Sequence, residues 1–286
     1  MTNRTRAESI LLAMTMIWGS TFVVVKLGLA DISPVFYTSL RFLISCIIFL
    51  PLFYHKIFPI PRTAWKKGIV LGFFLLAGFV TQVIGLNITT ASKSGFITGT
   101  LVIFTPLLQI FIEKKFPRIG NFIGVVFVTT GLYLLTSPEG SQFNAGDFLT
   151  LCCAILYALY IIFLDMYSDE KVEVLTFLQF LFVGVGGLLY ALLSEKIVFN
   201  FTTPAVLSLG YTCLFATLLT TFIQTKYQKQ TTPTRAAIIF SIEPVISACL
   251  AYIILYERIG AMGILGGGLI ITGILISETS DMWKKK

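Results

Sequence analysis

Long apolar runs separated by short polar stretches dominate this sequence. Most of these runs are close to the length that an α-helix needs to cross the hydrocarbon core of a bilayer. Their expected limits are Ala7–Gly28, Pro34–Tyr54, Trp65–Ile88, Ser92–Ile112, Ile119–Thr136, Gly146–Met166, Val174–Leu193, Pro204–Tyr227, Pro233–Tyr256 and Gly260–Ser277. Because most connections contain only a few residues, consecutive helices should be antiparallel neighbours. The pattern predicts an all-α polytopic membrane protein with ten transmembrane helices.

Two of these segments contain a proline near the middle. In Pro233–Tyr256, Glu243 and Pro244 are adjacent near the expected bilayer midplane, and Thr105 and Pro106 lie 138 positions upstream. A charge at that depth costs about 2.5–3.5 kcal/mol on insertion scales, so Glu243 should face protein or a water-filled cavity. Proline removes a backbone hydrogen bond, so both prolines are predicted helix breaks. Interrupted helices at matching places in two halves indicate the binding site of a transporter.

The two halves of the chain are weakly similar at a nearly constant offset. Trp18 matches Tyr157 at an offset of 139, the mid-span prolines match at 138, and glycines in the last segment of each half match at 142. Each half contains five apolar segments, an odd number, so the second half enters the membrane upside down. We therefore expect two inverted five-helix repeats, residues 1–140 and 141–286, around a central cavity.

Composition and charge support a membrane protein and predict its orientation. The 286 residues are 56% hydrophobic and 12% charged, whereas a soluble domain is about a quarter charged. The net charge of +7 comes from basic residues scattered among loops, so no nucleic-acid partner is expected. Fifteen Lys and Arg residues fall on the side of the N-terminus and four on the other side. This bias predicts a protein of the cytoplasmic (inner) membrane with both termini in the cytoplasm.

Motifs for catalysis and nucleotide binding are missing from the sequence. It contains no P-loop, no GxSxG, no HExxH and no cluster with metal-ligand spacing, so no cofactor, no metal and no enzyme activity are expected. The five cysteines lie within apolar segments and are interpreted as small buried side chains. The alternative is an integral-membrane enzyme acting on a lipid or lipid-linked substrate. Its catalytic groups would have to come from the acidic stretch Asp165, Asp169, Glu170 and Glu173.

Charged and aromatic residues inside the apolar segments are the main candidates for the transport path. Glu243 could bind a substrate amine, take up a proton, or serve a structural role beside Pro244. Arg41 could pair with a carboxylate, hold an anionic substrate group, or extend outward to lipid headgroups. Trp18, Tyr157 and Tyr160 could stack on a substrate or simply pack in the core.

Uncharged polar residues within the segments form a second group of candidates, which could line a cavity or only bond neighbouring helices. They are Gln82, Thr98, Thr105, Gln109, Thr220 and Gln224. Glu8 and Asp147, near the starts of repeat-related helices, are interpreted as favourable charges at the positive ends of those helices.

Four stretches carry a resemblance to a known family. The first half contains MIWGSTFVVVKLGL (Met16–Leu29), followed by Arg41-Phe42 in the next segment. The second half contains AGDFLTLCCAILYALYIIF (Ala145–Phe163), RAAIIFSIEPVISACLAYIILYERIG (Arg235–Gly260) and GILGGGLIITGILI (Gly263–Ile276). In this order and spacing, the chain resembles the EamA-type proteins of the drug/metabolite transporter superfamily.

The resemblance implies ten helices in two inverted repeats around a central cavity and movement of small metabolites across the cytoplasmic membrane, often outward. We therefore expect a secondary transporter that works by alternating access on amino-acid-, nucleoside- or drug-like solutes. A proton-coupled exporter is the first expectation and facilitated diffusion the second. The expected partners are a small-molecule substrate and the lipid bilayer, for a monomer or homodimer.

Overall fold

Helices account for nearly all the regular structure of the computed structural model, which describes residues 3–136, 143–254, 256 and 260–279. The first half contains α1 (Asn3–Gly28), α2 (Pro34–Ile57), α3 (Arg62–Ile88), α4 (Ala91–Gly99), α5 (Leu101–Glu113) and α6 (Ile119–Thr136). The second half contains α7 (Ala145–Met166), α8 (Val172–Ser194), α9 (Thr203–Cys213), η1 (Leu214–Leu219), α10 (Thr220–Tyr227), η2 (Gln228–Gln230), α11 (Pro233–Phe240), α12 (Glu243–Ile254) and α13 (Ala261–Thr279).

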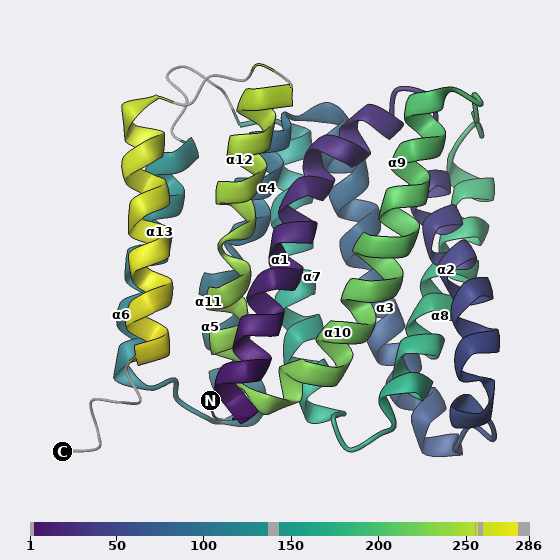
Figure 1. The fold of residues 1–286 in the computed structure, drawn as a ribbon, viewed down its shortest axis with the longest axis horizontal. Helices are drawn as coiled ribbons and strands as arrows, with labels where there is room; N and C mark the ends of the chain where they lie inside the picture. Colours follow the sequence, from purple (N-terminus) through teal and green to yellow (C-terminus); the bar gives the residue numbers. More distant parts are fainter. Residues whose placement is uncertain (1–2, 137–142, 255, 257–259, 280–286) are drawn as a thin grey trace.

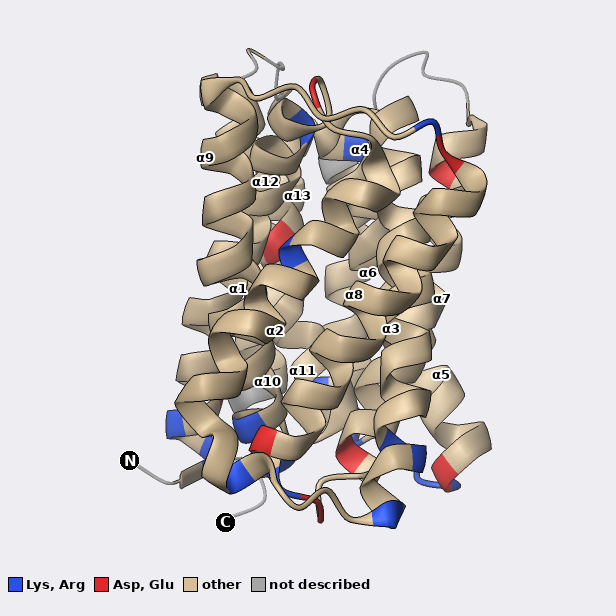
Figure 2. Ribbon diagram, turned by 90° about the vertical axis from the view of Figure 1, so that its right-hand side faces the viewer, with Lys and Arg blue, Asp and Glu red and all other residues tan. Residues whose placement is uncertain are grey.

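These helices form ten spans, as predicted. Eight spans are long and apolar enough to cross a membrane, and three of the eight consist of helices joined end to end: α4 with α5, α9 with α10 through η1, and α11 with α12. The shorter apolar helices α6 and α13 supply the other two spans. Figure 2 shows that the charged residues gather mainly at the two ends of the bundle. We call the end where α1 begins and α13 ends the terminal face, and the opposite end the distal face (Figure 1).

Helix packing follows a two-fold relation between the halves, which confirms the inverted-repeat architecture. Two contacts join equivalent helices of the two halves, α2 with α8 and α6 with α13, and the equivalent broken spans pack through α4 on α12 and α5 on α11. The packing of α3 on α7 has its counterpart in the packing of α9 and α10 on α1. In Figure 1, α6 and α13 form one edge of the bundle, while α2 and α8 lie at the other. The predicted boundary between residues 140 and 141 lies within the segment 137–142, which is outside the described residues.

The two broken spans are interrupted near the middle of the bundle, but not in the same way at each proline. Between α11 and α12 the interruption is a turn at Ser241 and Ile242, directly before Glu243 and Pro244. Between α4 and α5 it lies at Thr100, whereas Pro106 sits inside α5. The expected break at Pro106 is therefore wrong in position. The helix opens six residues earlier, where the Thr100 N–H donates to Ile97 O in a tighter turn.

Glycines bring α6 and α13 into close contact. A Cβ atom added at Gly131 would lie 2.6 Å from the backbone oxygen of Gly266, and one at Gly124 would lie 2.9 Å from that of Gly273. These four glycines match at an offset of 142, so the two-fold relation exchanges one contact for the other. Small residues stabilise helix pairs in membranes because they let the backbones approach closely.

Replacing Gly131 with alanine should destabilise the bundle. The added methyl group meets a backbone oxygen that cannot rotate away, and overpacking of this kind costs about 1–3 kcal/mol. We expect a lower unfolding temperature for Gly131→Ala in detergent, measured by fluorescence or light scattering. Gly268→Ala is the matched control, because a Cβ there meets open space and alanine favours helix formation. Equal stability of both variants would contradict the proposed close contact.

Candidate functional site

A small cavity of ≈ 60 Å³ lies between the two halves, near the interruptions of both broken spans. Seven of the eleven candidate residues line it: Trp18, Arg41, Gln82, Tyr157, Tyr160, Gln224 and Glu243. A smaller space shares the Arg41 and Gln82 walls and extends along α3 to Leu86. The cavity therefore collects residues from both repeats, which the sequence places far apart.

Glu243 occupies the first position of α12, where the chain leaves the turn at Ser241 and Ile242. Its side chain is partly exposed to the cavity. Among the described residues, no hydrogen bond or ion pair involves its carboxylate. Gly19 of α1 packs directly on this point, since a Cβ added there would lie 2.9 Å from Glu243 O. The backbone of Glu243 is thus fixed by packing, while its carboxylate is available to a ligand.

The Arg41 side chain is buried, with an exposed fraction of 4%, so it does not extend outward to lipid headgroups. Its Nε donates to Thr217 Oγ1 at 2.7 Å, and its Nη2 donates to Ala216 O at 3.2 Å. The guanidinium also lies 4.9 Å from the centroid of the Phe79 ring. No ion pair between Arg41 and a carboxylate is present in the described parts of the chain.

The contacts of Arg41 explain how the cavity wall tolerates an irregular helix. Thr217 and Ala216 belong to η1, a π-helical segment, in which carbonyls depart from the usual α-helical hydrogen bonding. Ser45 Oγ donates to Cys213 O at 2.9 Å, just before this segment, on the side that faces α2. Polar side chains of α2 therefore bond backbone carbonyls in and next to the π-helical segment beside the cavity. Within a membrane these carbonyls need protein partners, because lipid offers no hydrogen-bond donors.

Two aromatic residues line the cavity in repeat-related positions. Trp18 Nε1 donates to Thr220 Oγ1 at 2.9 Å, and the Tyr157 hydroxyl donates to Gln82 Oε1 at 3.1 Å. Trp18 matches Tyr157 at an offset of 139, and Gln82 matches Thr220 at 138. The two-fold relation therefore exchanges one bonded pair for the other. Tyr160 also lines the cavity, and its hydroxyl donates to Gln179 Oε1 at 2.6 Å.

Four candidate residues do not line the cavity. Thr98 and Thr220 stand behind the wall, where each bonds a lining side chain. Thr105 Oγ1 donates back to Leu101 O of its own helix at 2.7 Å. Gln109 bonds Glu113 and accepts from Thr234, away from the cavity.

Seven lining residues were not among the candidates: Thr21, Leu75, Phe79, Leu101, Ile161, Thr221 and Phe240. Helical spacing could have indicated several of them, because side chains three positions apart share a face. Thr21 follows Trp18 at that spacing, Phe79 precedes Gln82, and Thr221 precedes Gln224.

The acidic stretch on which a membrane enzyme would depend pairs largely with lysines. Lys67 Nζ lies 2.7 Å from Asp169 Oδ2 and 3.0 Å from Glu170 Oε1, and Lys56 pairs with Glu173 at 3.3 Å. The hydrogen bond from Lys67 holds the pKa of the Asp169 carboxyl below its usual value. These contacts tie α2 and α3 to the loop before α8 and to the start of α8.

Comparison with solved structures supports the same architecture. One crystal structure matches with a TM-score of 0.82 and 15% sequence identity, over 99% of this chain and 99% of the other. At that identity the likeness shows the fold alone.

Sequence relatives are named as transporters. A protein named uncharacterized transporter from Archaeoglobus fulgidus is 31% identical over 274 residues, covering 96% of this chain and 86% of the relative. The uncharacterized transporter YoaV from Bacillus subtilis is 24% identical, covering 93% of this chain and 94% of the relative. The family model described as the EamA-like transporter family matches twice, at residues 5–137 and 144–279. This multi-pass membrane protein belongs to the EamA-like transporter family.

Proposed function

We propose that the protein is a secondary transporter that moves a small organic solute across the cytoplasmic membrane by alternating access, in the direction of export. The observation that carries the proposal is the Glu243 carboxylate, which faces a cavity between two inverted repeats and has no partner among the described residues. A binding site at the interface of the repeats suits alternating access, because rocking of one repeat against the other exposes it to each side in turn.

The chemistry of the cavity favours a solute with a cationic group and an apolar body. A carboxylate at this depth is costly unless a proton or a cation neutralises it, so Glu243 would hold either one in turn. The faces of Trp18 and Tyr157 offer stacking surfaces for a planar or amphipathic group. Amino-acid-, nucleoside- and drug-like solutes fit this description, and exchange of the solute for a proton at Glu243 would couple export to the proton gradient.

We further propose that the terminal face lies in the cytoplasm, since it carries the excess of Lys and Arg. The transporter would work as a monomer or homodimer in the lipid bilayer, without enzyme activity. The pairing of the acidic stretch with Lys67 and Lys56 supports a structural role for those carboxylates rather than a catalytic one.

Substitution of Glu243 with glutamine should abolish most of the coupled transport. We expect saturable uptake of one labelled metabolite pool into inverted vesicles, driven by a pH gradient. In Glu243→Gln the initial rate should fall by roughly tenfold or more, since a hydrogen bond to a charged group contributes about 1.5–3 kcal/mol. Glu170→Gln, which removes a loop carboxylate outside the cavity, is the matched control and should transport normally.

Two outcomes would count against this assignment. Full transport with unchanged pH dependence in Glu243→Gln would return Glu243 to a structural role. If wild-type vesicles took up no pool while detergent-solubilised protein released product from lipid, the membrane-enzyme alternative would replace the transporter proposal.

Truncation of Trp18 should weaken substrate binding more than it slows turnover. An aromatic contact is worth about 0.5–1.5 kcal/mol beyond its buried area, so Trp18→Ala should raise KM by roughly tenfold and Trp18→Phe by less. Transport kinetics over a range of solute concentrations would measure this. Trp65→Ala, at a half-exposed position outside the cavity, is the matched control. An unchanged KM in Trp18→Ala, together with a lower unfolding temperature, would show that Trp18 only packs.

A further inference from the structure

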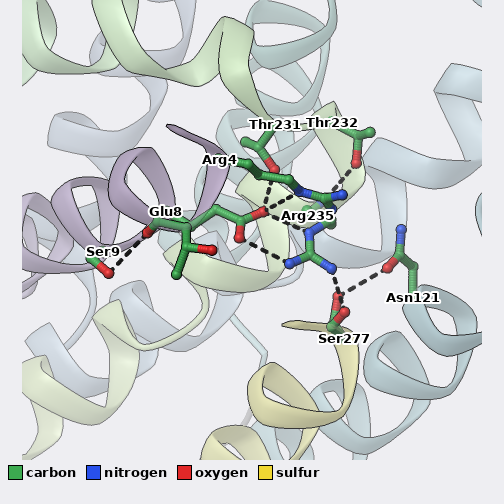
Figure 3. A network of polar contacts seen from close by, with 9 residues as sticks. Arg4, Glu8, Ser9, Asn121, Thr231, Thr232, Arg235 and Ser277 are labelled. Atoms are coloured by element: carbon green, nitrogen blue, oxygen red, sulfur yellow. Dashed lines mark hydrogen bonds and ion pairs between the residues drawn. The ribbon is translucent and has the colours of Figure 1, made fainter. Parts of the chain in front are cut away.

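A buried ion pair joins α1 to α11 at the terminal face (Figure 3). The carboxylate of Glu8 accepts hydrogen bonds from Arg235 Nε at 2.7 Å and Arg235 Nη2 at 3.0 Å. Thr231 Oγ1 donates to the same carboxylate at 2.7 Å, and Arg4 Nε approaches it at 3.0 Å. Glu8 is therefore more than a favourable charge at a helix end, which was its expected role. It holds the start of another span.

The same contact extends to α13 and α6. Arg235 Nη1 donates to Ser277 O, and Ser277 Oγ bonds Asn121 Oδ1 at 3.1 Å. Figure 3 shows Arg235 between Glu8 on one side and Ser277 on the other. With exposed fractions of 3% for Arg235 and 5% for Glu8, this cluster is buried at the first turn of α11.

A second ion pair occupies the corresponding place at the distal face. Lys93 Nζ lies 2.6 Å from Asp147 Oδ2, and Thr89 Oγ1 donates to Asp147 Oδ1 at 2.7 Å. Asp147 also accepts from the backbone N–H of Asn144 and completes a capping box at the start of α7. The expected helix-end role of Asp147 is therefore present, but the carboxylate also holds the start of α4.

The two clusters are built in the same way from matching residues of the two repeats. Thr89-Thr90 and Lys93 match Thr231-Thr232 and Arg235 at a constant offset of 142. In each copy the second threonine caps the half-helix by accepting the backbone N–H of the basic residue, which is thereby fixed in the first turn. The first threonine and the basic side chain then bind the carboxylate that begins the first helix of the other repeat.

Each cluster lies at the start of a short helix, α11 or α4, whose other end reaches the cavity. From Arg235, α11 runs to the turn at Ser241 and Ile242, directly before Glu243. From Lys93, α4 runs to the interruption at Thr100, directly before the lining residue Leu101. The bound carboxylates precede the cavity aromatics Trp18 and Tyr157 by ten residues each, roughly 15 Å along a helix.

A half-helix that ends at a turn can tilt about that turn when its far end is released. We propose that the Glu8–Arg235–Thr231 cluster and the Asp147–Lys93–Thr89 cluster are the two latches of alternating access, the first closing the terminal face and the second the distal face. The inference rests on the proposed transport function. Opening one latch frees α11 or α4 to tilt away from the cavity, while the other latch keeps the opposite face closed.

Thiol accessibility tests this assignment without any substrate. A cysteine-free background carries Thr21→Cys as a reporter in the cavity wall. A membrane-impermeant, charged methanethiosulfonate reagent is applied to right-side-out and to inverted vesicles. Lys196→Cys and Lys229→Cys, at exposed loop positions of the distal and terminal faces, verify the sidedness of each preparation.

Neutralising one latch should open one face only. For Lys93→Gln with Asp147→Asn, we expect labelling of the reporter to become about tenfold faster from the distal face and to stay unchanged from the terminal face. For Glu8→Gln with Arg235→Gln, the faster labelling should come from the terminal face. Each paired substitution removes both charges, so no unpaired charge is left buried.

Milder variants keep the test decisive if a paired substitution fails to fold. Thr89→Ala and Thr231→Ala each remove one hydrogen bond and should accelerate labelling by about threefold, from the distal and the terminal face respectively. Thr272→Ala is the matched control, because Thr272 is exposed and bonds only its own helix. Its labelling should equal that of the unmodified background.

The latch assignment is wrong if these variants speed labelling equally from both faces, or change it from neither, while the sidedness markers react normally. Retained solute uptake in the background protein would then leave the proposed transport function standing. One-sided opening without uptake of any solute would support the latches and contradict the transport proposal instead.

Discussion

Irregular backbone inside a bilayer is tolerated only where protein groups replace the lost helical hydrogen bonds. This constraint governs the centre of the molecule. The π-helical segment η1 is met by Arg41, while the interruptions at Thr100 and at Ser241–Ile242 tighten into short turns. All three irregular segments lie beside the same cavity. The cavity therefore lies where three spans depart from regular α-helix.

The packing contacts around this centre follow the two-fold relation, whereas the carboxylate in the cavity wall does not. The glycine contacts of α6 and α13, the bonded pairs of Trp18 and Tyr157, and the ion pairs at both faces each occur in two related copies. The offset of 142 that relates the two broken spans matches Glu243 with Leu101, the first residue of α5, so the carboxylate occurs in one copy only. Symmetric walls suit opening to either side, whereas the single carboxylate gives the cavity one acidic site.

Close contacts at glycines and buried ion pairs have different mechanical roles in such a bundle. The close contact of α6 with α13 relies on backbone oxygens that cannot move aside, so it suits a part that stays rigid. Hydrogen-bonded ion pairs can break and re-form as their surroundings gain or lose water, which suits parts that separate. The protein uses the first kind of contact between α6 and α13 and also between α3 and α7, where Gly85 and Gly146 meet, and the second kind at the starts of α11 and α4.

The sequence by itself determined the number of spans, the inverted repeats and the family. Apolar length, the offset of 138 to 142 and the order of short motifs are properties of the chain, so no packing information was needed. It also singled out Glu243, Trp18 and Tyr157, which line the cavity. Tertiary structure alone decided where the fourth span opens and which polar side chains reach the cavity. A proline removes one hydrogen bond, but packing against neighbouring helices decides which turn of the span is interrupted. A hydroxyl such as that of Thr105 can bond its own helix instead of a ligand. The partners of Glu8 and Asp147 were hidden for the same reason, because each lies in a distant span that only folding brings near.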